Sequence, residues 1–181
     1  MSDQGCSVKL LQKIPIFRGL NETECRQLAD IARTQDFAPG ELIIRQGKSS
    51  QNLWVVLEGK CEVVKHKGDS LAARDSLVLA VLEPHSHFGE MSFFSPAPHS
   101  ASVRAQTAVK LLKIARGDYD ELIEEGIWAA YKLAYNVVEN MADRLRRMDE
   151  WVSELASHNP PDQKVPEWST FRDKLFTGWN L

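Results

Sequence analysis

Hydrophobic and polar positions change their spacing twice along the chain. Asn21 and Glu24 have the spacing of a capping box, and apolar side chains around them fall on one helical face. This face runs from Leu20 to Ala32. From Phe37 the apolar stretches become short and are separated by glycines and prolines. The change predicts an opening helix followed by a series of short strands.

The strand-like stretches are rich in β-branched and large apolar residues. They cover residues 42–45, 53–57, 61–64, 77–82, 102–105 and 109–114, with a predicted loop at 84–98. About six to eight short strands at this close spacing favour a small antiparallel β-roll or jelly roll. The predicted fold class is therefore mainly β with flanking helices.

After Gly117 the helical spacing returns, first over residues 119–125 and then without interruption over residues 127–157. In the longer segment, steps of four and three between apolar residues repeat as a heptad a/d seam. Its members are Ile127, Tyr131, Ala134, Val138, Met141, Leu145, Met148, Val152 and Leu155. The seam predicts a homodimer that pairs through this helix.

A single amphipathic helix lying on its own domain is the alternative. A helix of this length spans ~45 Å, which is more than a small roll covers, so self-pairing is favoured. Arg144 at a g position and Asp149 at an e position suit an ion pair across a parallel dimer. The flanking positions of the first half widen the stripe enough to touch both the partner and the roll. They are Trp128, Ala130, Tyr135 and Val137.

These patterns divide the chain into four segments. They are an N-terminal helical segment (1–35), a β-roll (36–116), a hinge with the dimerisation helix (117–157) and a C-terminal tail (158–181). Large apolar side chains at near-helical spacing mark the tail, namely Trp168, Phe171, Leu175 and Trp179. Because such groups seldom stay in water, we expect the tail either to pack on its own dimer or to dock an effector protein through residues 166–181.

Composition limits the classes of function. With 22 Lys and Arg against 25 Asp and Glu, the chain has no overall basic field for nucleic acid or an anionic membrane. No signal peptide and no apolar run of ~20 residues is present in the sequence, so we expect a cytoplasmic protein. The three cysteines, Cys6, Cys25 and Cys61, are expected to be reduced structural thiols.

Residues 87–92, His-Phe-Gly-Glu-Met-Ser, and residues 98–105, Pro-His-Ser-Ala-Ser-Val-Arg-Ala, carry a specific resemblance. Together they resemble the phosphate-binding cassette of the cyclic-nucleotide-binding family, and most of all that of the bacterial catabolite-activator and FNR-like regulators. The resemblance covers residues 15–155. It implies a β-roll, a dimerisation helix, and cyclic AMP or cyclic GMP as effector ligand, with no metal.

The resemblance also implies roles for individual residues. Glu90 takes the place of the family's glutamate that accepts a hydrogen bond from the ribose 2′-hydroxyl. Ser100 and Ala101 take the places of the hydroxyl and small residue beside the phosphate. Gly89 lets the backbone approach the ligand, and amides at a helical turn favour a phosphate. Those amides belong to Glu90, Met91 and Ser92.

Four positions depart from the family pattern. His99 stands where the family has its phosphate-binding arginine, which costs on the order of 1.5–3 kcal/mol, or roughly ten- to a hundred-fold in affinity. If His99 protonates against a phosphate, affinity should rise as the pH falls through ~6.5. His85 replaces a glycine before the cassette. On the helix, Met148 and Asp149 replace small hydroxyl residues, although Asp149 and Arg144 remain candidate ligand contacts.

Other chemistries receive less support. The spacing of His85, His87 and Glu90 is similar to the first metal motif of cupins, with His99 as a fourth candidate ligand, but it is short by a residue. No Gly-rich Walker loop or serine nucleophile elbow occurs in the sequence, so no enzyme is expected. The arginines at 144, 146 and 147 alternate with acidic residues, which is typical of a solvated face.

Two functions remain open at this point. Only 26 residues follow Leu155, too few for a winged helix-turn-helix, so no direct DNA binding is expected. The first hypothesis is a stand-alone dimeric sensor that acts on a partner protein. The second is a degenerate roll that serves as a dimerisation and interaction scaffold. The two differ at His99, since a phosphate contact supports the sensor and a cassette capped by its own side chains supports the scaffold.

Overall fold

The computed structural model describes residues 8–66 and 76–158, without the side chains of Val152 and residues 155–158. The predicted seam positions Val152 and Leu155, and the predicted docking tail at 166–181, therefore lie outside the described side chains. The chain forms two compact units, Met1–Asn140 and Met141–Leu181. The second unit begins inside the segment that the sequence analysis assigned to the hinge and dimerisation helix.

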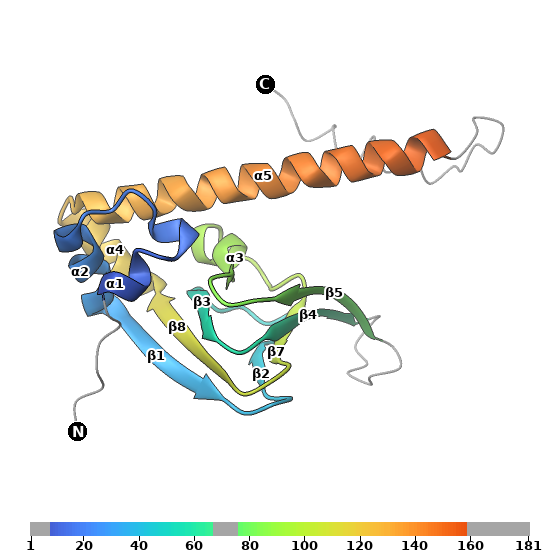
Figure 1. The fold of residues 1–181 in the computed structure, drawn as a ribbon, viewed down its shortest axis with the longest axis horizontal. Helices are drawn as coiled ribbons and strands as arrows, with labels where there is room; N and C mark the ends of the chain where they lie inside the picture. Colours follow the sequence, from blue (N-terminus) through green and yellow to red (C-terminus); the bar gives the residue numbers. More distant parts are fainter. Residues whose placement is uncertain (1–7, 67–75, 159–181) are drawn as a thin grey trace. The chain divides into compact units, whose positions relative to one another are not determined.

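Three short helical elements open the first unit. They are α1 (Val8–Leu11), η1 (Pro15–Phe17) and α2 (Glu22–Ile31). The predicted capping box of α2 is confirmed, since the Glu24 amide donates to Asn21 Oδ1 at 2.9 Å and the Asn21 amide donates to Glu24 Oε2 at 2.8 Å. With α4 (Arg116–Glu124), these elements gather at one end of the strands (Figure 1).

Two four-stranded antiparallel sheets form the roll, which confirms the predicted fold class. The first sheet has the order β1 (Ala32–Phe37), β8 (Val109–Ala115), β3 (Asn52–Glu58), β6 (His87–Phe88). The second has the order β2 (Leu42–Ile44), β7 (Ser102–Ala105), β4 (Cys61–His66), β5 (Ser76–Leu82). All six predicted strand stretches are confirmed to within about two residues at each end.

Two strands differ from the predictions. β1 lies partly in the expected helical segment 1–35, because Ala32 already pairs with Ile114 of β8. β6 lies in the expected loop at 84–98, where Trp54 pairs with Phe88. Neither strand carries a strong apolar pattern: β1 is largely polar and β6 has only two residues. Backbone pairing with longer neighbouring strands holds both in place.

The central strand β3 is buried on both faces, which explains its continuous apolar sequence. Val56 packs between the two sheets in a cluster with Trp54 and Leu111. Val55 points to the opposite side, into a second cluster that joins β3 and β8 to the helices. Cys61 belongs to the inter-sheet cluster, and burial raises the pKa of its thiol to about 11. Cys25 and Cys61 are both free and buried.

The long helix α5 (Trp128–His158) crosses the boundary between the two units. Its first turns close the helical cluster of the first unit through Ala130, Leu133 and Val137. The Asn136 side-chain amide donates to the carbonyls of Ile16 and Arg18 at 2.9 and 2.8 Å, which fixes the helix to the N-terminal segment. In the part of the chain that the structure describes, no helix is both long and apolar enough to cross a bilayer.

Candidate functional site

The cassette begins where β6 ends at Gly89. This residue adopts φ +85°, in the left-handed region, and is the N-cap of the short helix α3 (Glu90–Phe94). A Cβ atom here would lie 2.5 Å from the Asn52 carbonyl oxygen of β3. The glycine predicted to allow close approach to a ligand is therefore required by the protein's own backbone.

Alternate sides of α3 have different surroundings. Glu90 is 6% exposed and Ser92 is buried, whereas Met91 is 60% exposed. Phe93 enters the helical core cluster and anchors the turn. Because the N-cap is a glycine, it has no side chain with which to cap the first amides of α3. The predicted ligand residues of this turn thus include one buried carboxylate and one buried hydroxyl.

His99 is held by its backbone and by both nitrogens of its ring. Its amide donates to the Lys48 carbonyl and its carbonyl accepts from the Gly47 amide, each at 2.9 Å. Its Nε2 lies 2.7 Å from Ser50 Oγ, and its Nδ1 lies 3.1 Å from Ser92 Oγ. His99 is 8% exposed, and this burial lowers the pKa of the imidazole below its ordinary value of 6.5.

The cassette ends beside strand β4. Ser100 is exposed, and its carbonyl accepts a hydrogen bond from the Lys65 ammonium at 2.6 Å. Ala101 is half-buried. The Ser102 hydroxyl is buried and accepts from the Gln46 amide at 3.0 Å, which ties the start of β7 to the end of β2. The Lys65 ammonium of β4 thus lies at the cassette. The sequence analysis did not predict this cation.

The predicted contacts on the long helix lie in the other unit. Arg144 and Asp149 are exposed there. They remain predicted ligand contacts. Sequence reasoning missed Ser50 and Lys65 because neither belongs to a local motif. Only the pairing of the loop after β2 with residue 99, and of β4 with β7, brings them to the cassette.

The four residues that resembled a cupin metal motif do not assemble. Within residues 8–66 and 76–158, no three His, Cys, Asp or Glu side chains form a group that could hold a metal ion. His85 instead occupies a turn with φ 74°, and its amide donates to the Val56 carbonyl at 2.7 Å. His99 binds two serines, as described above.

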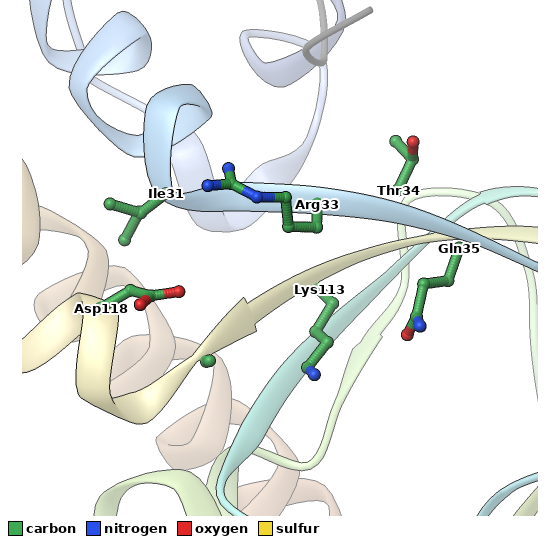
Figure 2. Close-up of a pocket in the computed structure, with 7 residues that line it drawn as sticks. Ile31, Arg33, Thr34, Gln35, Lys113 and Asp118 are labelled. Carbon is green, nitrogen blue, oxygen red and sulfur yellow. The ribbon is translucent and has the colours of Figure 1, made fainter. Parts of the chain in front are cut away.

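A separate pocket of about 240 Å³ lies on the β1–β8 side of the roll. Arg33, Lys113 and Asp118 contribute its charged side chains. Figure 2 shows the Arg33 side chain extending toward Ile31 and the Lys113 side chain extending in a different direction. The Arg33 guanidinium also donates to the Asp30 and Ala32 carbonyls, at 2.6 and 2.9 Å. Because the two cations do not converge, we do not assign the function to this pocket.

The fold and the cassette define a family. The sequence pattern of the cyclic nucleotide-binding domain matches residues 34–126, about half of the chain and nearly all of the roll. The protein belongs to the cyclic nucleotide-binding domain family.

Among its relatives, the cAMP-dependent protein kinase regulatory subunit of Schizosaccharomyces pombe is 26% identical over 158 residues, which cover 86% of this chain and 34% of the relative. The Thermus thermophilus catabolite activator protein has a TM-score of 0.67 at 30% identity, covering 78% of this chain and 63% of that chain. A cyclic nucleotide-binding domain from Methylobacillus flagellatus has a TM-score of 0.69 at 18% identity, over 81% and 80% of the two chains, and shares the fold. The chain thus spans about a third of the length of the kinase subunit.

Proposed function

We propose that the protein is a regulatory module that binds a cyclic nucleotide at residues 89–101. The observation that carries the proposal is a buried carboxylate, Glu90, at the start of α3 and beside the left-handed Gly89. Membership of the cyclic nucleotide-binding domain family supports it. So do relatives named for cyclic AMP, including the kinase regulatory subunit of Schizosaccharomyces pombe.

The chemistry of the site suits a ribose and a singly charged phosphodiester. A carboxylate in the position of Glu90 accepts a hydrogen bond from a ribose hydroxyl, and this contact is strong because the acceptor is charged. At the phosphate end, a histidine with a lowered pKa replaces an always-charged arginine. Affinity should therefore be roughly ten- to a hundred-fold weaker than with an arginine. Burial also moves any protonation-driven gain in affinity below the pH of ~6.5 expected from the sequence.

A continuous set of contacts leads from the cassette to α5 within the first unit. The Arg116 guanidinium donates to the Phe93 carbonyl of α3 and to Asp120 of α4, both at 2.7 Å. The Phe93 ring packs on Tyr119, with centroids 5.1 Å apart. The Tyr119 hydroxyl donates to the Ala130 carbonyl of α5 at 3.0 Å. A ligand that shifts α3 would thus bias α4 and the start of α5, provided that it binds the two arrangements with different affinities.

We propose that α5 carries this signal through a homodimer. An apolar stripe is exposed on its first turns, formed by Trp128, Tyr131, Tyr135 and Val138. A groove of about 500 Å³ runs beside it, between α5 and the residues Arg18 and Gly19. In the second unit, Met141, Leu145 and Met148 of the predicted seam are also exposed. Large apolar side chains that recur along one helix favour a second helix as their partner.

Calorimetric titration with cyclic AMP and cyclic GMP tests the ligand. We expect one of them to bind the wild-type protein, and Glu90→Gln to weaken that binding by roughly ten-fold or more, because a charged acceptor for the ribose is lost. The matched control is Glu83→Gln, which removes an exposed carboxylate paired with Lys60. Glu83→Gln should bind like the wild type. An unchanged affinity in Glu90→Gln would contradict the proposed site.

One observation favours the scaffold as a second candidate. Both ring nitrogens of His99 already have serine partners, so this part of the cassette is satisfied by the protein itself. The scaffold predicts no heat with either cyclic nucleotide, even in a His99→Arg variant that restores the family's charge. The sensor predicts binding in the wild-type protein and tighter binding in that variant.

A further inference from the structure

We infer that Ser50 is a ligand-facing hydroxyl of the cassette and that His99 is a positioning residue, which holds the hydroxyls of Ser50 and Ser92 rather than contacting the phosphate itself. This inference rests on the proposed function. It changes the role that the family resemblance gives to position 99, and it adds a residue from a different loop to the site.

The first argument is the number of hydrogen-bonding atoms on the His99 ring. An imidazole has only two nitrogens, and in His99 both are engaged, by Ser50 Oγ at 2.7 Å and by Ser92 Oγ at 3.1 Å. A phosphate could reach either nitrogen only by displacing a serine. His99 as a whole residue is only 8% exposed, so it has little surface to offer a ligand.

Accessibility then distinguishes the two serines. Ser92 lies on α3 and is buried, whereas Ser50 lies in the loop between β2 and β3 and is half-buried. That loop is fixed to the cassette by the two backbone hydrogen bonds of residues 47 and 48 with His99, each 2.9 Å long. Ser50 is therefore both accessible and held in place.

The Ser50 hydroxyl can donate a hydrogen bond to the ligand while it accepts one from His99. A serine oxygen that accepts a hydrogen bond from a ring N–H keeps its own O–H for another acceptor. We assign the ring proton to Nε2, so that Ser50 accepts from His99 and its O–H is available to a phosphodiester oxygen. Ser92 then donates to Nδ1. A neutral donor of this kind suits a singly charged cyclic phosphate, and the Lys65 ammonium at Ser100 adds a positive charge on the same cassette.

Three variants test the assignment by calorimetric titration with cyclic AMP. Ser50→Ala should weaken binding by about ten-fold, because a hydrogen bond to a charged acceptor is lost. Ser50→Thr keeps the hydroxyl and should bind within about two-fold of the wild type. The matched control is Ser49→Ala, which changes the exposed neighbouring serine of the same loop and should have no effect.

A double-mutant cycle shows whether His99 acts through Ser50. His99→Ala should lose about as much affinity as Ser50→Ala, and the double variant should lose little more than either. Nitrogen NMR of the ligand-free protein should find the proton on Nε2, with the His99 signals displaced in Ser50→Ala but not in Ser49→Ala. Thermal melts check that each variant folds. If His99→Ala does not fold, the comparison of Ser50→Ala with Ser50→Thr decides the inference alone.

The outcomes separate the inference from the proposed function. If the wild-type protein binds cyclic AMP and Ser50→Ala binds equally well, the inference is wrong and the proposed function stands. Additive losses in the cycle would also overturn it, because His99 would then contact the ligand independently. If the wild-type protein binds no cyclic nucleotide at all, the proposed function and the inference fall together.

Discussion

Gly89 meets two independent requirements at the start of the cassette. Its φ of +85° is rarely adopted by residues with a side chain, and an added Cβ would meet the Asn52 carbonyl at 2.5 Å. Gly40 has nearly the same φ, +84°, but open space around it. The pair therefore separates the cost of the backbone conformation from the cost of the steric overlap.

We predict that Gly40→Ala lowers the free energy of unfolding by about 1 kcal/mol through conformation alone. Gly89→Ala should lower it by roughly 1–3 kcal/mol more, because β3 has to move away from the new methyl group. Urea denaturation of both variants measures the difference. Equal losses in the two would mean that the close approach to Asn52 contributes nothing.

His85 shows the opposite situation, a side chain in a conformation that suits glycine. Its φ is 74°, and the sequence resemblance placed a glycine at this position. We predict that His85→Gly stabilises the protein by up to about 1 kcal/mol, since relief of the strain exceeds the entropy that glycine gains in the unfolded chain. Ser86→Gly, next to it and without a positive φ, should destabilise by a similar amount. Loss of stability in both would show that His85 is not strained.

At the scale of elements, α2 and α5 are joined by an ion pair. The Lys132 ammonium lies 2.8 Å from the Glu24 carboxylate. The pKa of Glu24 is lowered, first by the side-chain hydrogen bond from Lys132 and then by the backbone contact with Asn21, against an opposing effect of burial. A carboxylate whose pKa falls on folding stabilises the protein above its unfolded pKa of 4.5 and loses that contribution as the pH falls through the folded value.

Glu24→Gln isolates this charge, because a glutamine at the same position still completes the capping box. We predict a loss of about 0.5–1 kcal/mol in the free energy of unfolding near pH 7, a modest figure since Lys132 is partly exposed. The loss should shrink as the pH falls below 4.5 and disappear once the pH is below the lowered pKa of Glu24, where the wild-type carboxylate is protonated in the folded protein as well. The matched control is Glu22→Gln on the same turn, whose ion pair with Arg26 is exposed. If Glu24→Gln is still less stable than the wild type in acid, the loss does not come from the charge of Glu24.

The helices and strands were largely predictable from the sequence wherever the pattern of apolar and polar side chains reflects which of them are buried. Val55 and Val56 face different clusters, and the short apolar run around them identified a strand. β1 and β6 were not predictable in this way, because their positions depend on pairing with β8 and β3. The helix α5 carries a repeating apolar pattern along its length, so its bounds were foreseen to within about two residues.

The candidate site was predictable only in part. Glu90, Ser92 and His99 belong to one short motif, so their spacing in the sequence was informative. Ser50 lies 49 residues before its partner His99, and Lys65 lies 35 residues before Ser100. No local spacing reports such contacts, because the register of separate strands and loops creates them. The sequence therefore indicated the candidate residues of the cassette, but not Ser50 and Lys65, which contact His99 and Ser100.

At the scale of the whole molecule, neighbouring valines on α5 distinguish folding from association. Val137 is fully buried in the core of the first unit, whereas Val138 is 60% exposed on the apolar stripe. We predict that Val137→Ala lowers the free energy of unfolding by roughly 2 kcal/mol through a cavity. Val138→Glu should leave the first unit folded and weaken self-association, since it places a charge in the helix seam.

Sedimentation velocity over a range of concentrations measures self-association of the wild type and of the variants Val137→Ala and Val138→Glu. Circular dichroism measures their helix content. We expect dimers in the wild-type protein and monomers with native helix content in Val138→Glu. A wild-type protein that stays monomeric at every concentration would overturn the proposed homodimer, while the fold and the cassette would be unaffected.

Hydrogen exchange with and without cyclic AMP tests the central claim most directly, because it locates the ligand on the chain. We predict slower exchange over residues 89–101 and in the loop around Ser50, with smaller changes in α4 and at the start of α5. Protection confined to other regions, or none at a saturating concentration of cyclic AMP or cyclic GMP, would contradict the assignment of the cassette as a cyclic-nucleotide site.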